Sequence, residues 1–161
     1  MNSRIRGIED CDLLLLIGTN PKTEAPVLNA RIRKAAKNDL KIGVVGSAVD
    51  LTYEYEHLGN TTRVLMDILE GKHPFCSRIA NVNTWFTKAK LPMMLVGSSV
   101  FERTDGEEIN KLLMQIVKLG NFINTESKWN GFNILHRVIY SFTLGIRKRW
   151  SPRNRYPPLQ S

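Results

Sequence analysis

Four residues that could bind a ligand follow the most apolar run near the N-terminus. Gly18, Thr19, Asn20 and Pro21 come directly after Leu13–Ile17. In open α/β sheets, ligands bind at the carboxyl ends of the strands, so a ligand of this chain is expected at this loop. The hydroxyl and amide could donate to a phosphate or a base. Tight turns require the same residue types, so plain turn chemistry is the competing interpretation.

A second polar loop, Gly97-Ser98-Ser99, follows another apolar run and offers two further hydroxyl donors. A dinucleotide fingerprint needs the pattern G-x-G-x-x-G between a strand and a helix, and each of the two loops contains a single glycine. A Walker-type phosphate-binding lysine motif is also absent. Any nucleotide would therefore have to bind without the usual close approach to a glycine-rich backbone.

The histidines and cysteines do not form a recognisable site. His57, His73 and His136 each stand alone in the sequence, with no thiol or carboxylate at ligand spacing. Cys11 and Cys76 lack C-x-x-C spacing, so we predict buried free thiols and no zinc or iron–sulfur site. We therefore predict no catalytic residue, no metal ligand and no redox centre in this chain. Whether it belongs to an enzyme is left open by its residues alone.

A cluster of acidic residues lies on one segment of the chain. Asp50, Glu54, Glu56 and His57 fall within a few positions of one another and could bind a cation. A solvated surface is the alternative interpretation, because charged clusters without ligand spacing are usually exposed.

Positive charge is concentrated at the C-terminus. The formal net charge is +8, and residues 146–161 contribute five basic residues without an acid. This stretch, IRKRWSPRNRYPPLQS, lacks an apolar period, so we expect a disordered basic tail after an α/β domain over residues 1–145. Arginine mixed with Trp150 and Tyr156 suits single-stranded nucleic acid or an acidic membrane surface. That evidence is weak, so we expect no nucleic acid partner and no membrane insertion.

The polar loops are positioned by alternating strands and helices. Continuous apolar runs predict buried strands at Leu13–Ile17, Lys41–Gly46 and Pro92–Gly97. Helices are predicted from about Pro26, over Thr61–Glu70, and from a Thr104–Glu107 capping box to about Lys118. The sequence thus predicts a three-layer α/β domain with a mostly parallel, incomplete Rossmann-like sheet.

The remaining segments give weaker patterns. Residues 1–11 resemble the end of a helix, and Ser47–Gly59 is expected to be an extended loop. Phe75–Lys90 is predicted to be a weak helix. Apolar residues at Leu135, Val138, Ile139 and Phe142 predict a helix over Asn133–Thr143.

Long stretches resemble a known family. The chain is similar to the molybdopterin-oxidoreductase-like region of the largest iron–sulfur subunit of mitochondrial NADH:ubiquinone oxidoreductase, respiratory complex I. The resemblance covers about residues 2–139, and its segments follow the family's order. They are NSRIRGIEDCDLLLLIGTNPKTEAPVLNARIRK, KIGVVGSAVDLTYEYEHLG, GKHPFC, PMMLVGSSVFERTDG and NILHR.

The resemblance implies a role in electron transfer from NADH to ubiquinone. It implies iron–sulfur clusters held by a cysteine-rich N-terminal part that this chain lacks, and complex I matrix-arm subunits as partners. It also implies a location at the matrix side of the mitochondrial inner membrane, although no targeting sequence is present. In related molybdenum enzymes, loops equivalent to Gly18–Pro21 contact a molybdopterin guanine dinucleotide. The loop here is therefore expected to be a vestigial cofactor site.

The sequence departs from the family pattern at its start, within Ile79–Thr87 and after about Tyr140. We therefore expect a fragment that contributes a structural domain to the complex I subunit. One alternative is a domain of a true molybdopterin-dependent oxidoreductase that binds the pterin dinucleotide. Another is a non-catalytic binding module that uses the basic tail.

Overall fold

The computed structural model describes residues 2, 5–73, 75 and 89–136. A five-stranded sheet with strand order β3-β2-β1-β4-β7 forms its centre, and all four neighbouring pairs are parallel. The strands are β1 (Leu13–Ile17), β2 (Lys41–Val45), β3 (Glu56–Gly59), β4 (Pro92–Gly97) and β7 (Phe132–Leu135). The expected α/β class with a parallel sheet is confirmed.

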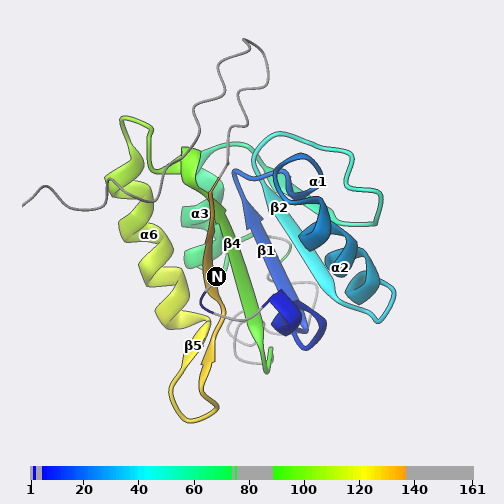
Figure 1. Cartoon of the computed structure of the whole chain (residues 1–161). Helices are drawn as coiled ribbons and strands as arrows, with labels where there is room; N and C mark the ends of the chain where they lie inside the picture. Colours follow the sequence, from blue (N-terminus) through cyan, green and yellow to red (C-terminus); the bar gives the residue numbers. More distant parts are fainter. Residues whose placement is uncertain (1, 3–4, 74, 76–88, 137–161) are drawn as a thin grey trace, which may run out of the picture.

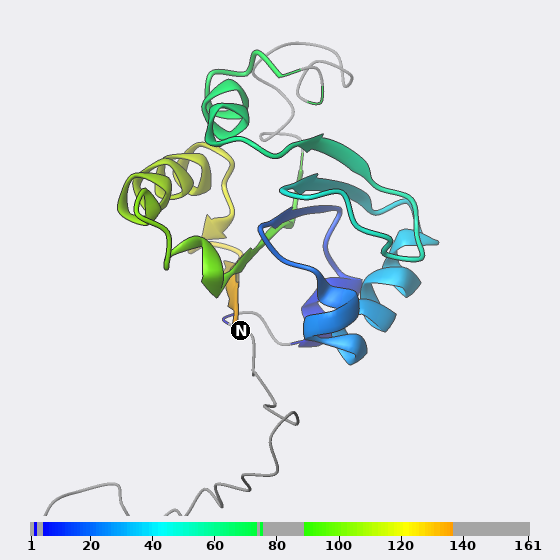
Figure 2. The same ribbon diagram turned by 90° about the horizontal axis from the view of Figure 1, so that it is seen from above.

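Helices cover both faces of the sheet (Figures 1 and 2). One face carries the 3₁₀ helix η1 (Ile5–Glu9), the single-turn α1 (Pro21–Glu24) and α2 (Pro26–Ala36). The other carries α3 (Thr62–Leu69) and α6 (Gly106–Leu119). The 3₁₀ turn η2 (Ser98–Val100) follows β4, and a small hairpin of β5 (Ile123–Asn124) and β6 (Trp129–Asn130) precedes β7.

Strand β1 shows why a continuous apolar run forms the central strand. All five of its residues are buried, and successive side chains of a strand point to opposite faces. Leu13, Leu15 and Ile17 join the core under α3 and α6. Leu14 and Leu16 join the core under α2. The run is unbroken because the strand has no solvent-facing side.

The predicted α2 is confirmed, with Leu28, Ile32 and Ala35 buried against the sheet. Its outer charges are partly paired. The carboxylate of Glu9 in η1 accepts from Arg31 and from Lys34, both at 2.6 Å. The hydrogen bond from Lys34 is the main cause that lowers the pKa of Glu9. The two contacts of Glu9 connect η1 to α2.

Two sequence predictions of secondary structure are wrong. Glu56–Gly59 forms β3 at one edge of the sheet, although Ser47–Gly59 was expected to be a loop throughout. Only Leu58 of this strand is buried, so it lacks the apolar run that marks the inner strands. Phe132–Leu135 forms β7 where a helix from Asn133 was expected. Pairing with β4 overrides the helical spacing there, since Met94 N donates to Gly131 O at 2.8 Å.

The expected Thr104–Glu107 capping box does not form. Helix α6 begins at Gly106, and its N-cap is Asp105, which makes no side-chain hydrogen bond to the helix. The Asp105 carboxylate instead binds the Arg103 guanidinium at 2.7 and 3.0 Å. Most of the helix predicted at Phe75–Lys90, the rest of that predicted to Thr143, and the basic tail lie outside the described residues.

Candidate functional site

Strands β1 and β4 are neighbours in the sheet and run parallel, so the two polar loops lie side by side at the carboxyl ends of these strands. The chain leaves β1 toward α2 on one face, and it leaves β4 toward α6 on the other. Ligands of open α/β sheets bind where neighbouring strands lead to opposite faces in this way. The loops after Ile17 and Gly97 are therefore the candidate site.

Polar groups of the first loop hydrogen bond to β2 and to α1. Gly18 adopts φ +57° and donates its N–H to Val45 O at 2.9 Å. The Thr19 hydroxyl, in a residue only 7% exposed, donates to the Glu24 carboxylate at 2.6 Å. The Asn20 side chain caps α1 by accepting from Lys22 N at 3.2 Å. Pro21, the first residue of α1, has no N–H to offer a ligand.

The ends of β1 and β4 are packed against each other. A Cβ placed on Gly97 would lie 2.2 Å from Gly18 O, and one placed on Gly18 would lie 2.3 Å from a methyl group of Val100. The second loop continues directly into η2, where Phe101 N donates to Ser98 O at 3.1 Å. The backbones thus fill the space between the two strand ends.

A small hollow remains beside this junction, on the side covered by α3 and α6. It has a volume of about 350 Å³, and its floor includes Ile17, Val45 and Leu65. Its polar rim consists of Asn60, Thr61, Thr62 and Arg103.

The positive charge of Arg103 on this rim is already paired with a carboxylate. Asp105 holds the Arg103 guanidinium through two hydrogen bonds, and this contact is the main cause that holds the pKa of Asp105 below its usual range. The Thr62 hydroxyl also points to Asp105, at 3.4 Å. Sequence reasoning missed this rim because it did not predict β3, the strand that leads into Asn60.

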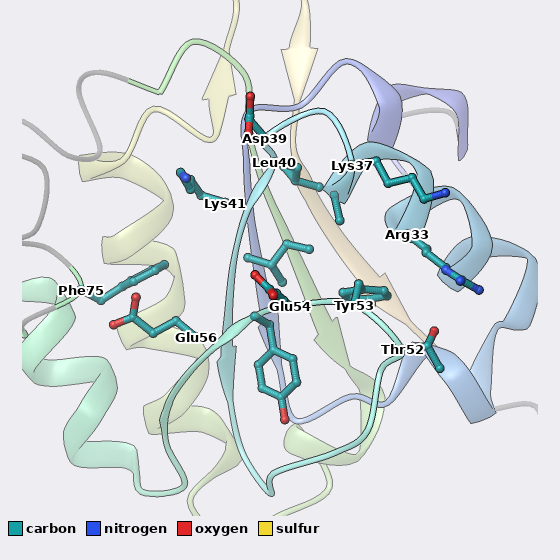
Figure 3. A pocket seen from close by; sticks show the side chains of 13 residues that line it. Arg33, Lys37, Asp39, Leu40, Lys41, Thr52, Tyr53, Glu54, Glu56 and Phe75 are labelled. Carbon is teal, nitrogen blue, oxygen red and sulfur yellow. The ribbon is translucent and has the colours of Figure 1, made fainter.

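A larger hollow of about 650 Å³ lies at the opposite, amino-terminal end of the sheet (Figure 3). It lies between the second half of α2, the start of β2 and the segment before β3. Its lining contains as many acidic as basic residues. The charge of the hollow therefore favours neither an anionic nor a cationic ligand. The charged residues are Arg33, Lys37, Lys41, Asp39, Glu54 and Glu56.

The isolated titratable residues have local structural partners. His57 Nε2 lies 2.7 Å from Gly46 O, and His73 Nε2 lies 3.1 Å from Leu58 O. Asp50 forms an exposed ion pair with Lys22 at 2.7 Å. Cys11 is buried, as expected, and Cys76 lies outside the described residues.

Among the residues that the structure describes, no group of three or more His, Cys, Asp or Glu side chains could hold a metal ion. The cluster of Asp50, Glu54, Glu56 and His57 therefore does not converge on a cation site within the described part of the chain. The same residues include no helix that is long and apolar enough to cross a membrane.

The fold and these loops define a three-layer, Rossmann-like α/β domain in which the carboxyl ends of β1 and β4 are tightly packed. A family model described as molybdopterin oxidoreductase matches residues 1–141, and the chain belongs to this family.

Its relatives include subunits of NADH–ubiquinone oxidoreductase. The chain is 41% identical over 136 residues to NADH dehydrogenase (ubiquinone) iron-sulfur protein 1, mitochondrial, of Solanum tuberosum, a match that covers 84% of this chain and 17% of that protein. It is also 41% identical over 158 residues to the NADH-ubiquinone oxidoreductase 75 kDa subunit of Reclinomonas americana, covering 94% and 22%. The expected resemblance to the complex I subunit is confirmed. The chain spans about a fifth of the length of these curated relatives.

The family implies a pterin dinucleotide, but the one side-chain hydroxyl of the first loop is already engaged by Glu24. Phosphate sites in such folds depend on free N–H and hydroxyl donors at a helix start. Here the donor of Thr19 is taken by Glu24, whose carboxylate would repel a phosphate. An added Cβ on Gly97 would lie 2.2 Å from Gly18 O, so the two backbones leave no room for a side chain between the strand ends.

Proposed function

We propose that this chain contributes a non-catalytic structural domain to the iron–sulfur subunit of mitochondrial NADH–ubiquinone oxidoreductase. The observation that carries the proposal is the hydrogen bond in the loop after β1, where the Thr19 hydroxyl donates to the Glu24 carboxylate at 2.6 Å. The similarity to 75 and 78 kDa subunits supports the assembly to which the domain would belong. The domain would occupy residues 1–145, with the basic residues 146–161 as an appended tail.

The role of such a domain is packing rather than electron transfer. Its two cores bury the sheet on both faces, and the outward surfaces of its helices would contact other matrix-arm subunits. The iron–sulfur clusters of the assembly would be carried by another part of the family subunit. Its location would be the matrix side of the mitochondrial inner membrane, which agrees with the word mitochondrial in the names of relatives.

The loop Gly18–Pro21 would then be a vestigial cofactor site. Its place at the strand end is that of a ligand loop, whereas its hydrogen bonds stabilise the start of α1. The alternative is a pterin-binding oxidoreductase domain, which the family model favours. That function requires the Thr19–Glu24 contact to break when the cofactor binds.

The assembly can be tested with the native product. Mitochondrial membranes would be solubilised, separated on a native gel and digested with trypsin, and the peptide Thr23–Arg31 followed by mass spectrometry. We expect it to comigrate with complex I subunits. Recovery of this peptide only in fractions without those subunits would contradict the proposal. A Leu15→Asp variant, which puts a charge into the buried centre of β1, provides the matched unfolded control.

A further inference from the structure

The two outer strands of the sheet each have one row of backbone groups that points away from it. Such edges pair readily with strands of other chains unless something covers them. Among the residues that the structure describes, β7 forms one edge of the sheet and β3 the other. Side chains distant in sequence hydrogen bond to both edges.

The outward groups of β7 can be identified from its pairing. Met94 N donates to Gly131 O, and the parallel register pairs Met94 with Phe132. In a parallel ladder, alternate residues bond to the neighbouring strand, so Phe132 and Ile134 direct their N–H and C=O groups outward.

Two asparagines satisfy both outward groups of Phe132. Its N–H donates to the side-chain oxygen of Asn130 at 3.2 Å. Its C=O accepts from Asn2 Nδ2 at 2.7 Å. The backbone N–H of Asn2 also donates to the side-chain oxygen of Asn133 at 2.6 Å, and Asn133 is fully buried. Asn2 is thereby fixed to the outer edge of the last described strand.

Strand β3 shows the same arrangement. Gly46 N donates to Gly59 O at 2.8 Å, so the C=O of the preceding Leu58 points outward. His73 Nε2 lies 3.1 Å from that oxygen, while His73 Nδ1 accepts from Phe75 N at 3.2 Å. Because Nδ1 is an acceptor, the proton lies on Nε2 and is donated to Leu58.

We propose that Asn2 and Asn130 are edge caps that stop a second copy of this chain from pairing with β7. Among the described outward positions of β7, Ile134 has no side-chain cap, and its own side chain is 48% exposed. An apolar, uncapped residue beside a capped one is where edge-to-edge pairing would begin once the caps are removed. The proposal does not depend on the proposed function.

The test compares self-association of the full chain and its variants by sedimentation velocity over a range of concentrations. Asn2→Ala removes the cap but keeps the backbone bond to Asn133, and Asn130→Ala removes the second cap. The exposed Asn38→Ala is the matched control. We expect the double variant to associate at an about tenfold lower protein concentration than the wild type or the control.

Adding Ile134→Lys to the double variant should restore the monomer, because charge on an edge strand opposes pairing. A folded double variant that associates only at the concentration at which the wild type associates, or higher, would overturn the proposal. So would association that persists with Lys at position 134. Thermal melts of each variant establish folding, and the single Asn2→Ala variant, which alters only an exposed side chain, gives the same test if the double variant does not fold.

Discussion

The hydroxyl of Thr19 and the carboxylate of Glu24, five residues apart, lie 2.6 Å from each other at the carboxyl end of β1. This contact uses the one hydroxyl in the loop and places a negative charge beside it. In a sheet of this class the same position would have to accept a phosphate from a bound nucleotide. On the proposed function, the contact would have to persist in a structural domain and to break in a cofactor-binding one.

Replacing Thr19 with Val should destabilise the domain. The variant keeps the shape of the side chain but leaves the carboxylate without its donor, at a cost of about 1–3 kcal/mol in the free energy of unfolding. Urea titration followed by circular dichroism measures this. Thr62→Val is the control, since the Thr62 hydroxyl lies 3.4 Å from its partner and should contribute less. Equal costs for the two variants would contradict the assignment.

Asp12 should hold the starts of β1 and β4 together. Its carboxylate accepts from Lys90 N at 2.6 Å and from Leu91 N at 3.1 Å. Asp12→Ala leaves both amides without this partner at an exposed site, so we expect a loss of about 1 kcal/mol in the free energy of unfolding. Hydrogen exchange at Leu91 should also become faster. The neighbouring exposed Asp10→Ala should change neither quantity, and unchanged exchange in Asp12→Ala would refute the role.

Gly97 should tolerate no side chain. An added Cβ would lie 2.2 Å from Gly18 O, so Gly97→Ala must displace the loop after β1. We expect it to cost about 3 kcal/mol or more in the free energy of unfolding, as for overpacking against backbone. The adjacent Ser98→Ala removes atoms instead and should stay within about 1 kcal/mol of the wild type. A Gly97→Ala variant of wild-type stability would show that the two strand ends are not in contact.

Cys11 should be unreactive in the folded chain. Burial is the main cause that raises the pKa of its thiol to about 12, and its Sγ donates to Ile8 O at 3.1 Å. At pH 8 its thiolate fraction should be about a thousandfold below that of an unperturbed cysteine, and alkylation should be slower by a similar factor. The rate should increase as the pH rises toward 12.

Iodoacetamide labelling of a Cys76→Ser variant isolates this thiol, and the same variant in guanidinium chloride gives the unperturbed rate. Equal rates with and without denaturant would show that Cys11 is accessible.

The inner strands could be predicted because their sequences carry the signal of two-sided burial. Leu13–Ile17 and Pro92–Gly97 are apolar at every position, and no helix face has that pattern. The edge strands are different. Glu56–Gly59 buries one side chain, and the apolar spacing that starts at Leu135 also fits a helix. Their strand conformation depends on pairing with β2 and β4, which the apolar pattern within each segment does not show.

The position of the candidate loop was predictable, but its hydrogen bonds were not. A glycine and polar residues after a buried strand identify Gly18–Pro21 as a strand-end loop. The role of Glu24 depends on α1, a single turn too short to leave a periodic pattern. The pairing of Arg103 with Asp105 was likewise missed, because Thr104–Glu107 gave a better match to a capping motif.

Pterin analysis of the purified chain tests the central claim most directly. The full chain would be isolated from cells that make molybdopterin, oxidised to release any pterin as a fluorescent product, and assayed for molybdenum in parallel. The account predicts that both signals equal those of a buffer blank, because Glu24 occupies the donor at the strand end. Pterin and molybdenum in amounts close to one per chain would contradict it and would favour the cofactor-binding oxidoreductase.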